Sequence, residues 1–246
     1  MSIPPPLKPA VLSPSVGQAA PLHIQVYDHI WRALMAGELP AGARLKDGVW
    51  AERLGVSRTP VREAFRKLMQ DGALDPLDSV GFCVHTFSPE EVTGLYACRA
   101  ALETLVAEEV AGLRSEELVK KLKANAADAK SALGRGDTDT LQRLNGEFHA
   151  ILLNASRNRH LRRLLEQTER SVHMARRQVL QRATADALRH QDYLRGLKAV
   201  LSHHQALITA IAAGDAAKAA ATMREHLLCT AHDMTLLLAV NVACAA

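Results

Sequence analysis

The chain has 246 residues, a length that suits two domains better than one. Hydrophobic residues make up 48 % of it and aromatic residues only 4 %, so aliphatic side chains that favour helices must build its cores. The net charge of +4 permits an anionic partner, whereas no apolar run is long enough for a membrane span. The four cysteines are far apart and form no CxxC pair, which predicts a reduced, cytoplasmic chain.

The first part of the chain is predicted to be a disordered segment followed by helices. Residues 1–21 are rich in proline, serine and alanine, which predicts a disordered arm. From Ile24 to Leu34 apolar side chains recur at helical spacing, and Gly37 predicts the end of that helix. A turn-bearing connector and a short helix over 49–54 are expected to follow.

The stretch GVSRTPVREAFRKLMQDG, residues 55–72, predicts a basic amphipathic helix. Ser57 is the predicted N-cap, so Pro60 falls in the first turn, where a missing N–H group costs nothing. The apolar residues share one face of the helix, and Arg58 and Arg62 lie on the polar face. A basic helix can simply face solvent, but its neighbours in the sequence favour a binding role.

Residues 73–87 predict a small β-hairpin, because Phe82 and Val84 alternate with other residues after a proline and a glycine. Three helices followed by a hairpin indicate a winged helix-turn-helix domain over residues 22–87. Arginine near the start of a helix in the major groove can donate two hydrogen bonds to guanine, and a neighbouring arginine or hydroxyl can bind phosphate. Double-stranded DNA is therefore the predicted partner.

A second domain is predicted over residues 88–240, where the pattern is helical throughout. Ser88 and Glu91 form a capping box around Pro89 at the first helical position. Breaks between helices are predicted at residues 112–115, 134–137, 156–158 and 214–215. We expect about six helices packed as an antiparallel bundle, so that the whole protein is mostly α.

Four segments together resemble a known family. The segment AERLGVSRTPVREAFRKLMQDGAL resembles the DNA-binding signature of the GntR family of bacterial transcription regulators. The segments LYACRAALETLVAEEVA, EFHAILLNASRN and HQALITAIAAGDAAKAAATMREHL resemble the FCD domain of its FadR-type branch. The resemblance covers roughly residues 22 to 235. It implies a homodimer that binds a two-fold symmetric operator, acts as a repressor, and senses an effector through the all-helical domain.

The resemblance also implies which residues contact DNA. Its DNA-binding residues fall on Ser57, Arg58, Thr59 and Arg62, with the two arginines as the main base or phosphate contacts. Two positions depart from the family pattern. Gly48 stands where the family often has a polar or charged DNA contact, and Asp78 makes the wing acidic, which is unfavourable near phosphates. We expect affinity to rest mainly on the basic helix.

Three histidines stand out in the second domain. Asn145 and His149 share one helix face, and His204 and His226 belong to two later helices, all in apolar surroundings. A single such histidine is typical of a core, but three together suit a divalent metal ion such as zinc, nickel or manganese. In the FCD family an aspartate and three histidines hold a metal, and the aspartate position is Asn145 here. Glu147 is a weaker substitute because it points to another face.

The metal is expected to anchor the carboxylate of a small organic acid, as the resemblance implies. Arg99 and Glu103 lie four residues apart on the first helix of the bundle, which predicts either a buried ion pair or a contact of Arg99 with the effector. Two other functions stay open. One is a metal-dependent helical enzyme fused to a DNA-binding domain, since a metal-bound water can act as a nucleophile. The other is a purely structural bundle that dimerises the DNA-binding domain.

Overall fold

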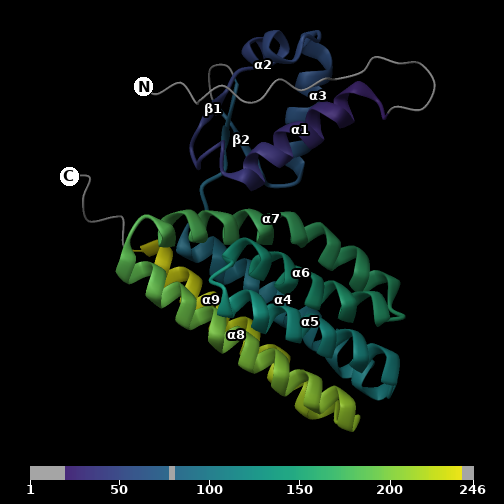
Figure 1. The fold of residues 1–246 in the computed structure, drawn as a ribbon. Helices are drawn as coiled ribbons and strands as arrows, with labels where there is room; N and C mark the ends of the chain where they lie inside the picture. The colour runs from purple at the N-terminus through teal and green to yellow at the C-terminus, as the bar shows by residue number, and fades with distance from the viewer. Residues whose placement is uncertain (1–19, 78–80, 240–246) are drawn as a thin grey trace. The chain divides into compact units, whose positions relative to one another are not determined.

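A computed structural model describes residues 20–77 and 81–239, and the chain divides into two compact units (Figure 1). The first unit comprises the described residues up to Phe87 together with Glu169–Gln181, and the second comprises Ser88–Thr168 and the described residues from Arg182 on. The disordered arm predicted for residues 1–21 falls almost entirely outside the described residues.

The first unit has the element order of a winged helix-turn-helix. Its elements are α1 (Leu22–Ala36), β1 (Arg44–Leu45), α2 (Asp47–Leu54), α3 (Arg58–Gln70), β2 (Leu74–Pro76) and β3 (Phe82–Val84). Gly37 ends α1 in the left-handed conformation, as predicted. α2 begins two residues earlier than predicted. Ser57 occupies the N-cap position of α3, as predicted, although its side chain makes no capping hydrogen bond.

The core of this unit is formed around one face of α3. The fully buried side chains of α3 are Val61, Ala64, Phe65 and Leu68, which confirms the predicted apolar face of this helix. Phe65 makes edge contacts with Trp50 of α2 and Phe82 of β3, at ring-centroid distances of 6.5 and 5.3 Å. Burying a large apolar side chain contributes about 1.5–3 kcal/mol. This packing fixes the rotation of α3 and leaves its basic face exposed.

The predicted hairpin is present, and a third strand extends it. The antiparallel sheet has the order β1-β3-β2, with Leu45 opposite Phe82 and Leu74 opposite Val84. The sequence predicted only a connector where β1 lies, because two residues are too few to show alternation. Gly81 has φ +112°, and a Cβ atom there would lie 2.7 Å from the Leu45 carbonyl oxygen, so the approach of β1 requires glycine. Asp78, the residue predicted to make the wing acidic, lies outside the described residues.

The second unit is helical, and six helices follow Ser88 in the part of the chain that the structure describes. They are α4 (Pro89–Gly112), α5 (Glu116–Gly134), α6 (Thr138–Ala155), α7 (Arg159–Thr184), α8 (Ala187–Ala213) and α9 (Ala216–Ala239). The capping box is confirmed, because Glu91 N donates to Ser88 Oγ and Ser88 N donates to a Glu91 carboxylate oxygen. All four predicted breaks are present. A further break precedes α8, where the Asp186 carboxylate accepts two backbone N–H groups.

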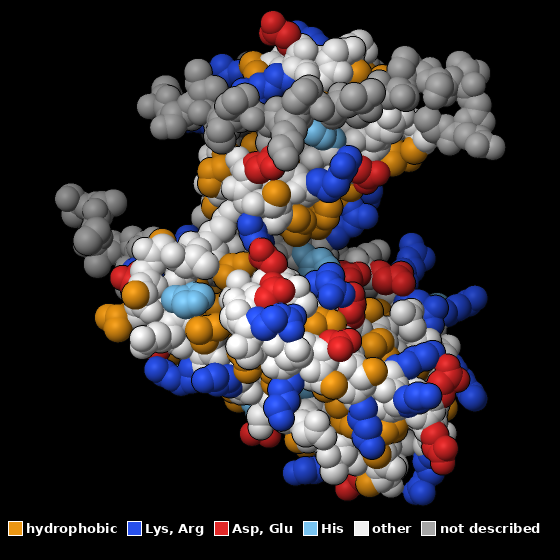
Figure 2. Space-filling model, viewed as in Figure 1, with side chains coloured by type: hydrophobic (Ala, Val, Ile, Leu, Met, Phe, Trp, Pro, Cys, Tyr) orange, Lys and Arg blue, Asp and Glu red, His pale blue; other side chains and the backbone are white. Residues whose placement is uncertain are grey.

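In the second unit α4 and α9 pack extensively against each other, and α8 contacts both. α6 also contacts α4, and α5 lies between α6 and α8. Tyr96, Leu122, Phe148 and Leu207 are among its fully buried large side chains. On the face shown in Figure 2, basic, acidic and hydrophobic side chains of this unit are interspersed rather than gathered by type. None of the described helices is long and apolar enough to cross a membrane.

Candidate functional site

The residues predicted to contact DNA lie together at the start of α3. Ser57, Arg58, Thr59 and Arg62 are all exposed. The two arginine side chains are 59 % and 56 % exposed, respectively. Their exposure follows from the burial of the opposite face of α3 against the core. The structure therefore brings two guanidinium groups to one polar surface, where each can reach an external acceptor.

A buried carboxylate holds both arginines. Asp47, at the start of α2, has a side chain that is only 9 % exposed. Its two oxygens lie 2.9 and 3.1 Å from Arg58 Nη2, and its Oδ2 accepts from Arg62 Nε at 2.5 Å. The hydrogen bond from Arg58, followed by that from Arg62 and the backbone N–H of Gly48, outweighs burial and lowers the pKa of Asp47 to about 2.

Sequence reasoning missed this role of Asp47. The contacts join residues 11 and 15 positions apart on two helices, so no helical period reveals them. The neighbouring Gly48, singled out as a departure from the family pattern, donates its backbone N–H to Asp47 Oδ1 at 2.8 Å. The sequence offered one signal for such a role: an acidic residue just upstream of the short helix that comes before the basic helix.

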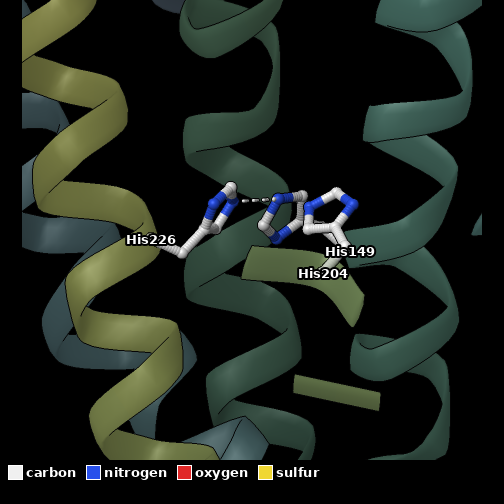
Figure 3. A group of neighbouring side chains, drawn as sticks. All are labelled: His149, His204 and His226. Carbon is white, nitrogen blue, oxygen red and sulfur yellow. Dashed lines mark hydrogen bonds between the residues drawn. The ribbon is translucent and has the colours of Figure 1, made fainter. Parts of the chain in front are cut away.

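The three predicted histidines meet inside the second unit. His149 comes from α6, His204 from α8 and His226 from α9, and their rings face one another (Figure 3). His204 and His226 are almost fully buried, and the His149 side chain is 9 % exposed. One ligand atom of each residue lies within 4.8 Å of the others, and Nε2 of His149 is 3.3 Å from Nε2 of His226.

This geometry fits one divalent ion. Two nitrogen ligands about 2.0–2.1 Å from a tetrahedral ion lie about 3.3–3.4 Å apart, which matches the separation of the two Nε2 atoms. Three imidazole donors suit zinc or nickel. Asn145 lies half-buried on α6, one turn before His149. Glu147 is exposed and forms an ion pair with Arg143, so it does not replace the missing aspartate.

A buried carboxylate also contacts this cluster. Glu103 of α4 accepts from Arg99 Nε at 2.7 Å through Oε1, and its Oε2 lies 2.5 Å from His149 Nδ1. Burial raises the pKa of Glu103, but Arg99 and His149 outweigh it and hold the pKa at about 2. The predicted ion pair between Arg99 and Glu103 is therefore present and buried, and its link to His149 is new.

Aromatic packing orients a second histidine. The His204 ring stacks on Phe148 with a centroid distance of 3.7 Å and an interplanar angle of 5°. The His203 ring meets His226 edge to face at 5.8 Å, so a fourth imidazole lies at the margin of the cluster. These contacts place ring planes, which restricts where each nitrogen can point.

Comparisons with known proteins agree with both units. The family model for bacterial regulatory proteins of the gntR family matches residues 22–84, and the FCD domain model matches residues 94–228. YdhC of Bacillus subtilis, an HTH-type transcriptional regulator, is 34 % identical over 157 residues, which cover 63 % of this chain and 70 % of YdhC. The matching families and relatives are transcription regulators and not enzymes.

Two further proteins are similar to the chain. The HTH-type transcriptional repressor RspR of Escherichia coli K12 is 30 % identical over 132 residues, which cover 54 % of this chain and 58 % of RspR, less than two thirds of its length. The solved structure of E. coli McbR/YncC superposes with a TM-score of 0.69 at 21 % identity, over 89 % of this chain and 98 % of that one. This last likeness shows a shared fold.

Proposed function

Because the chain belongs to the GntR family and carries an FCD domain, it is a DNA-binding transcription regulator, and we propose that a small organic acid bound at a metal ion in the FCD domain modulates its DNA binding. The observation that carries this proposal is the buried cluster of His149, His204 and His226. An all-histidine cluster in a hydrophobic bundle has little structural use, because apolar side chains fill such a core more favourably.

We propose that Ser57, Arg58, Thr59 and Arg62 contact the operator. Both arginines keep donors for an external acceptor while Asp47 holds them from one side. An arginine held in this way can bind a guanine edge or a phosphate without first losing its rotamer freedom. Repression is the proposed outcome, because the similar protein RspR is named a transcriptional repressor.

His149, His204 and His226, with the amide oxygen of Asn145 as a fourth donor, would hold the metal ion. The nitrogen-rich donor set favours zinc or nickel over manganese. The ion would supply a positive charge that binds a carboxylate. A neutral Asn145 in place of aspartate leaves the site more positive by one charge, which favours an anionic effector.

Arg99 supports an acid as the effector. Its guanidinium is buried beside the cluster, and its Nη1 has no hydrogen-bond partner among residues 20–77 and 81–239. A buried donor without a partner costs about 1–3 kcal/mol, which a bound acceptor would recover. Glu103 already accepts from the Nε and Nη2 edge, so Nη1 is the donor that we assign to the acid.

A homodimer is the proposed assembly. Leu105 on α4 and Leu228 and Leu236 on α9 are large, exposed hydrophobic side chains on two helices that pack together. Such side chains on adjacent helices are typical of an interaction surface. A second copy of the chain is the occupant that a two-fold symmetric operator requires.

The test begins with the metal alone. Protein reconstituted with zinc, nickel or manganese is examined by elemental analysis and thermal melting, before and after a chelator. An ion that binds only the folded state stabilises it, so we expect the chelator to lower the melting temperature. His149→Ala and His226→Ala should abolish this response. His232→Ala is the matched control, because His232 is an exposed histidine of α9 and should leave it intact.

The second step measures DNA binding. Duplexes are selected from a random-sequence library with wild-type protein, and a panel of small mono- and dicarboxylic acids is then added. We expect one class of acid to change the affinity of the metal-loaded protein. The His149→Ala variant should bind the same duplexes and ignore the acid. If no metal is retained and no acid alters stability or DNA binding, the bundle is a structural dimeriser and the proposal is wrong.

A further inference from the structure

The position of Glu103 has a consequence for the histidine cluster. We propose that Glu103 is a positioning residue that fixes the ring orientation and tautomer of His149, so that His149 Nε2 faces His226 and the metal. The role of Glu103 in metal binding rests on the proposed metal site. Its contact with His149, by contrast, is a property of the metal-free chain.

The tautomer follows from which atoms meet. Glu103 Oε2 lies 2.5 Å from His149 Nδ1. An ionised carboxylate can only accept hydrogen bonds, so Nδ1 must carry the proton and donate it. In the neutral imidazole the lone pair is then on Nε2, the atom that lies 3.3 Å from His226 Nε2. The ring is thus held in the only tautomer that offers Nε2 as a ligand.

Arg99 fixes Glu103 in turn. Its Nε and Nη2 both approach Oε1 of Glu103, at 2.7 and 2.6 Å, which leaves Oε2 for His149. The two residues lie one turn apart on α4, so the helix sets their separation. The guanidinium of Arg99 is always charged, and it pairs with Glu103 as a carboxylate. Two helices, α4 and α6, are joined by a chain of three buried polar side chains.

The same carboxylate supplies charge that the donor set lacks. Asn145 is neutral, so none of the four proposed ligands is an anion. A carboxylate that accepts from the far nitrogen of a ligating histidine makes that histidine a more basic ligand, and removing it lowers metal affinity about 10- to 100-fold. Glu103 therefore contributes negative charge through His149 rather than by direct ligation.

The experiment must separate positioning from folding. Glu103→Leu alone would leave Arg99 buried without its partner, which is strongly destabilising. The main variant is therefore the double replacement Arg99→Met with Glu103→Leu, which exchanges a buried ion pair for apolar side chains of similar size. Arg99→Met alone shows the effect of the arginine. Glu109→Gln is the matched control, because Glu109 is a carboxylate of α4 that accepts from Ser156 and the backbone of Arg157.

Two readouts are used. Nitrogen-15 NMR of histidine side chains in the metal-free protein at about pH 8 reports the tautomer of His149, and competition with a chromophoric chelator reports zinc affinity. We expect His149 to be protonated at Nδ1 in the wild type and to populate both tautomers in the double variant. Zinc affinity should fall about 10- to 100-fold in the double variant. It should fall less in Arg99→Met, because Glu103 keeps its contact with His149 but loses the group that fixes it. It should be unchanged in Glu109→Gln.

Two results would overturn the inference: a wild-type His149 that carries its proton on Nε2, or a double variant that binds zinc as tightly as the wild type. If the wild type itself retains no zinc, the proposed metal site is wrong, and the NMR measurement on the metal-free protein still decides whether Glu103 sets the tautomer.

Discussion

Replacing Asp47 with asparagine tests the contact that holds the two arginines proposed to bind DNA. Asparagine keeps the size of the side chain and one acceptor oxygen but removes the charge. Asp47 contacts both Arg58 and Arg62 and accepts from Gly48 N, so the change weakens three interactions together. We expect the variant to fold, to be less stable than the wild type, and to distinguish DNA sequences less well.

The size of the stability loss follows from the pKa of Asp47. A fall from its ordinary 3.8 to about 2, at 1.36 kcal/mol for each pKa unit, corresponds to at most about 2.4 kcal/mol at neutral pH. Both arginines are more than half exposed, so water and salt screen the interaction, and we expect about 1 kcal/mol. Such a loss lowers the melting temperature of a domain of this size by about 4–8 °C.

The pH dependence has a definite sign. Because folding lowers the pKa of Asp47, its contribution is fully present above pH 3.8 and is lost as the pH falls through about 2. The difference in unfolding free energy between wild type and Asp47→Asn should therefore be constant near neutral pH. It should shrink between pH 3.8 and 2. Urea unfolding at a series of pH values measures it.

Glu63→Gln is the matched control, because it removes one negative charge from α3 without touching the arginines. The exposed Glu63 has only a 3.5 Å contact with His23 among the ion pairs of the described chain. Both variants gain positive charge and should bind unselected DNA slightly more tightly. Only Asp47→Asn should narrow the affinity ratio between selected and unselected duplexes in fluorescence anisotropy. Equal ratios, or equal stabilities at all pH values, would refute the reasoning.

Three further changes have expected outcomes. Arg58→Ala or Arg62→Ala should weaken binding to a selected duplex by about 1–3 kcal/mol in anisotropy titrations. If either variant bound with wild-type affinity, the assignment of α3 as the DNA-recognition helix would be wrong. Phe148→Ala should lower the free energy of unfolding by about 3–5 kcal/mol in urea, because Phe148 is fully buried against His204; a loss below 1 kcal/mol would contradict that packing. Ser88→Ala should cost about 1 kcal/mol of stability by thermal melting, and no change would mean that the capping box contributes nothing.

Much of the fold could be predicted because its signals are local. Gly37 and Gly214 end helices in the left-handed conformation, and Ser88 caps one with its own side chain, so each is readable within a few residues. The break before Asp186 was not predicted, since the sequence around it has no glycine or proline. β1 was missed because its pairing with β3 joins segments about 40 residues apart.

The candidate sites were predictable only in part, for the same reason. Helical spacing placed Arg58 on a polar face and Arg99 beside Glu103, and the family resemblance selected the three histidines. Neither source indicates which helix faces which. The contact of Glu103 with His149 spans 46 residues, so it exists only once α4 and α6 have packed. Contacts between residues far apart in the chain produce no regular spacing in the sequence, so sequence analysis cannot predict them.

The contacts of Asp47 with two arginines and of Glu103 with His149, which the sequence did not predict, follow one physical principle. Asp47 contacts Arg62 at Nε, which leaves the two terminal nitrogens for the proposed DNA contact. Glu103 contacts His149 at Nδ1, which leaves Nε2 for the proposed metal. In each case a buried anion occupies one side of a binding group and orients the other. Ordering such a side chain on binding would cost about 0.5–1.5 kcal/mol. This cost does not arise at binding here, because the side chain is already ordered in the folded chain. Affinity at both sites should therefore depend on residues that touch no ligand.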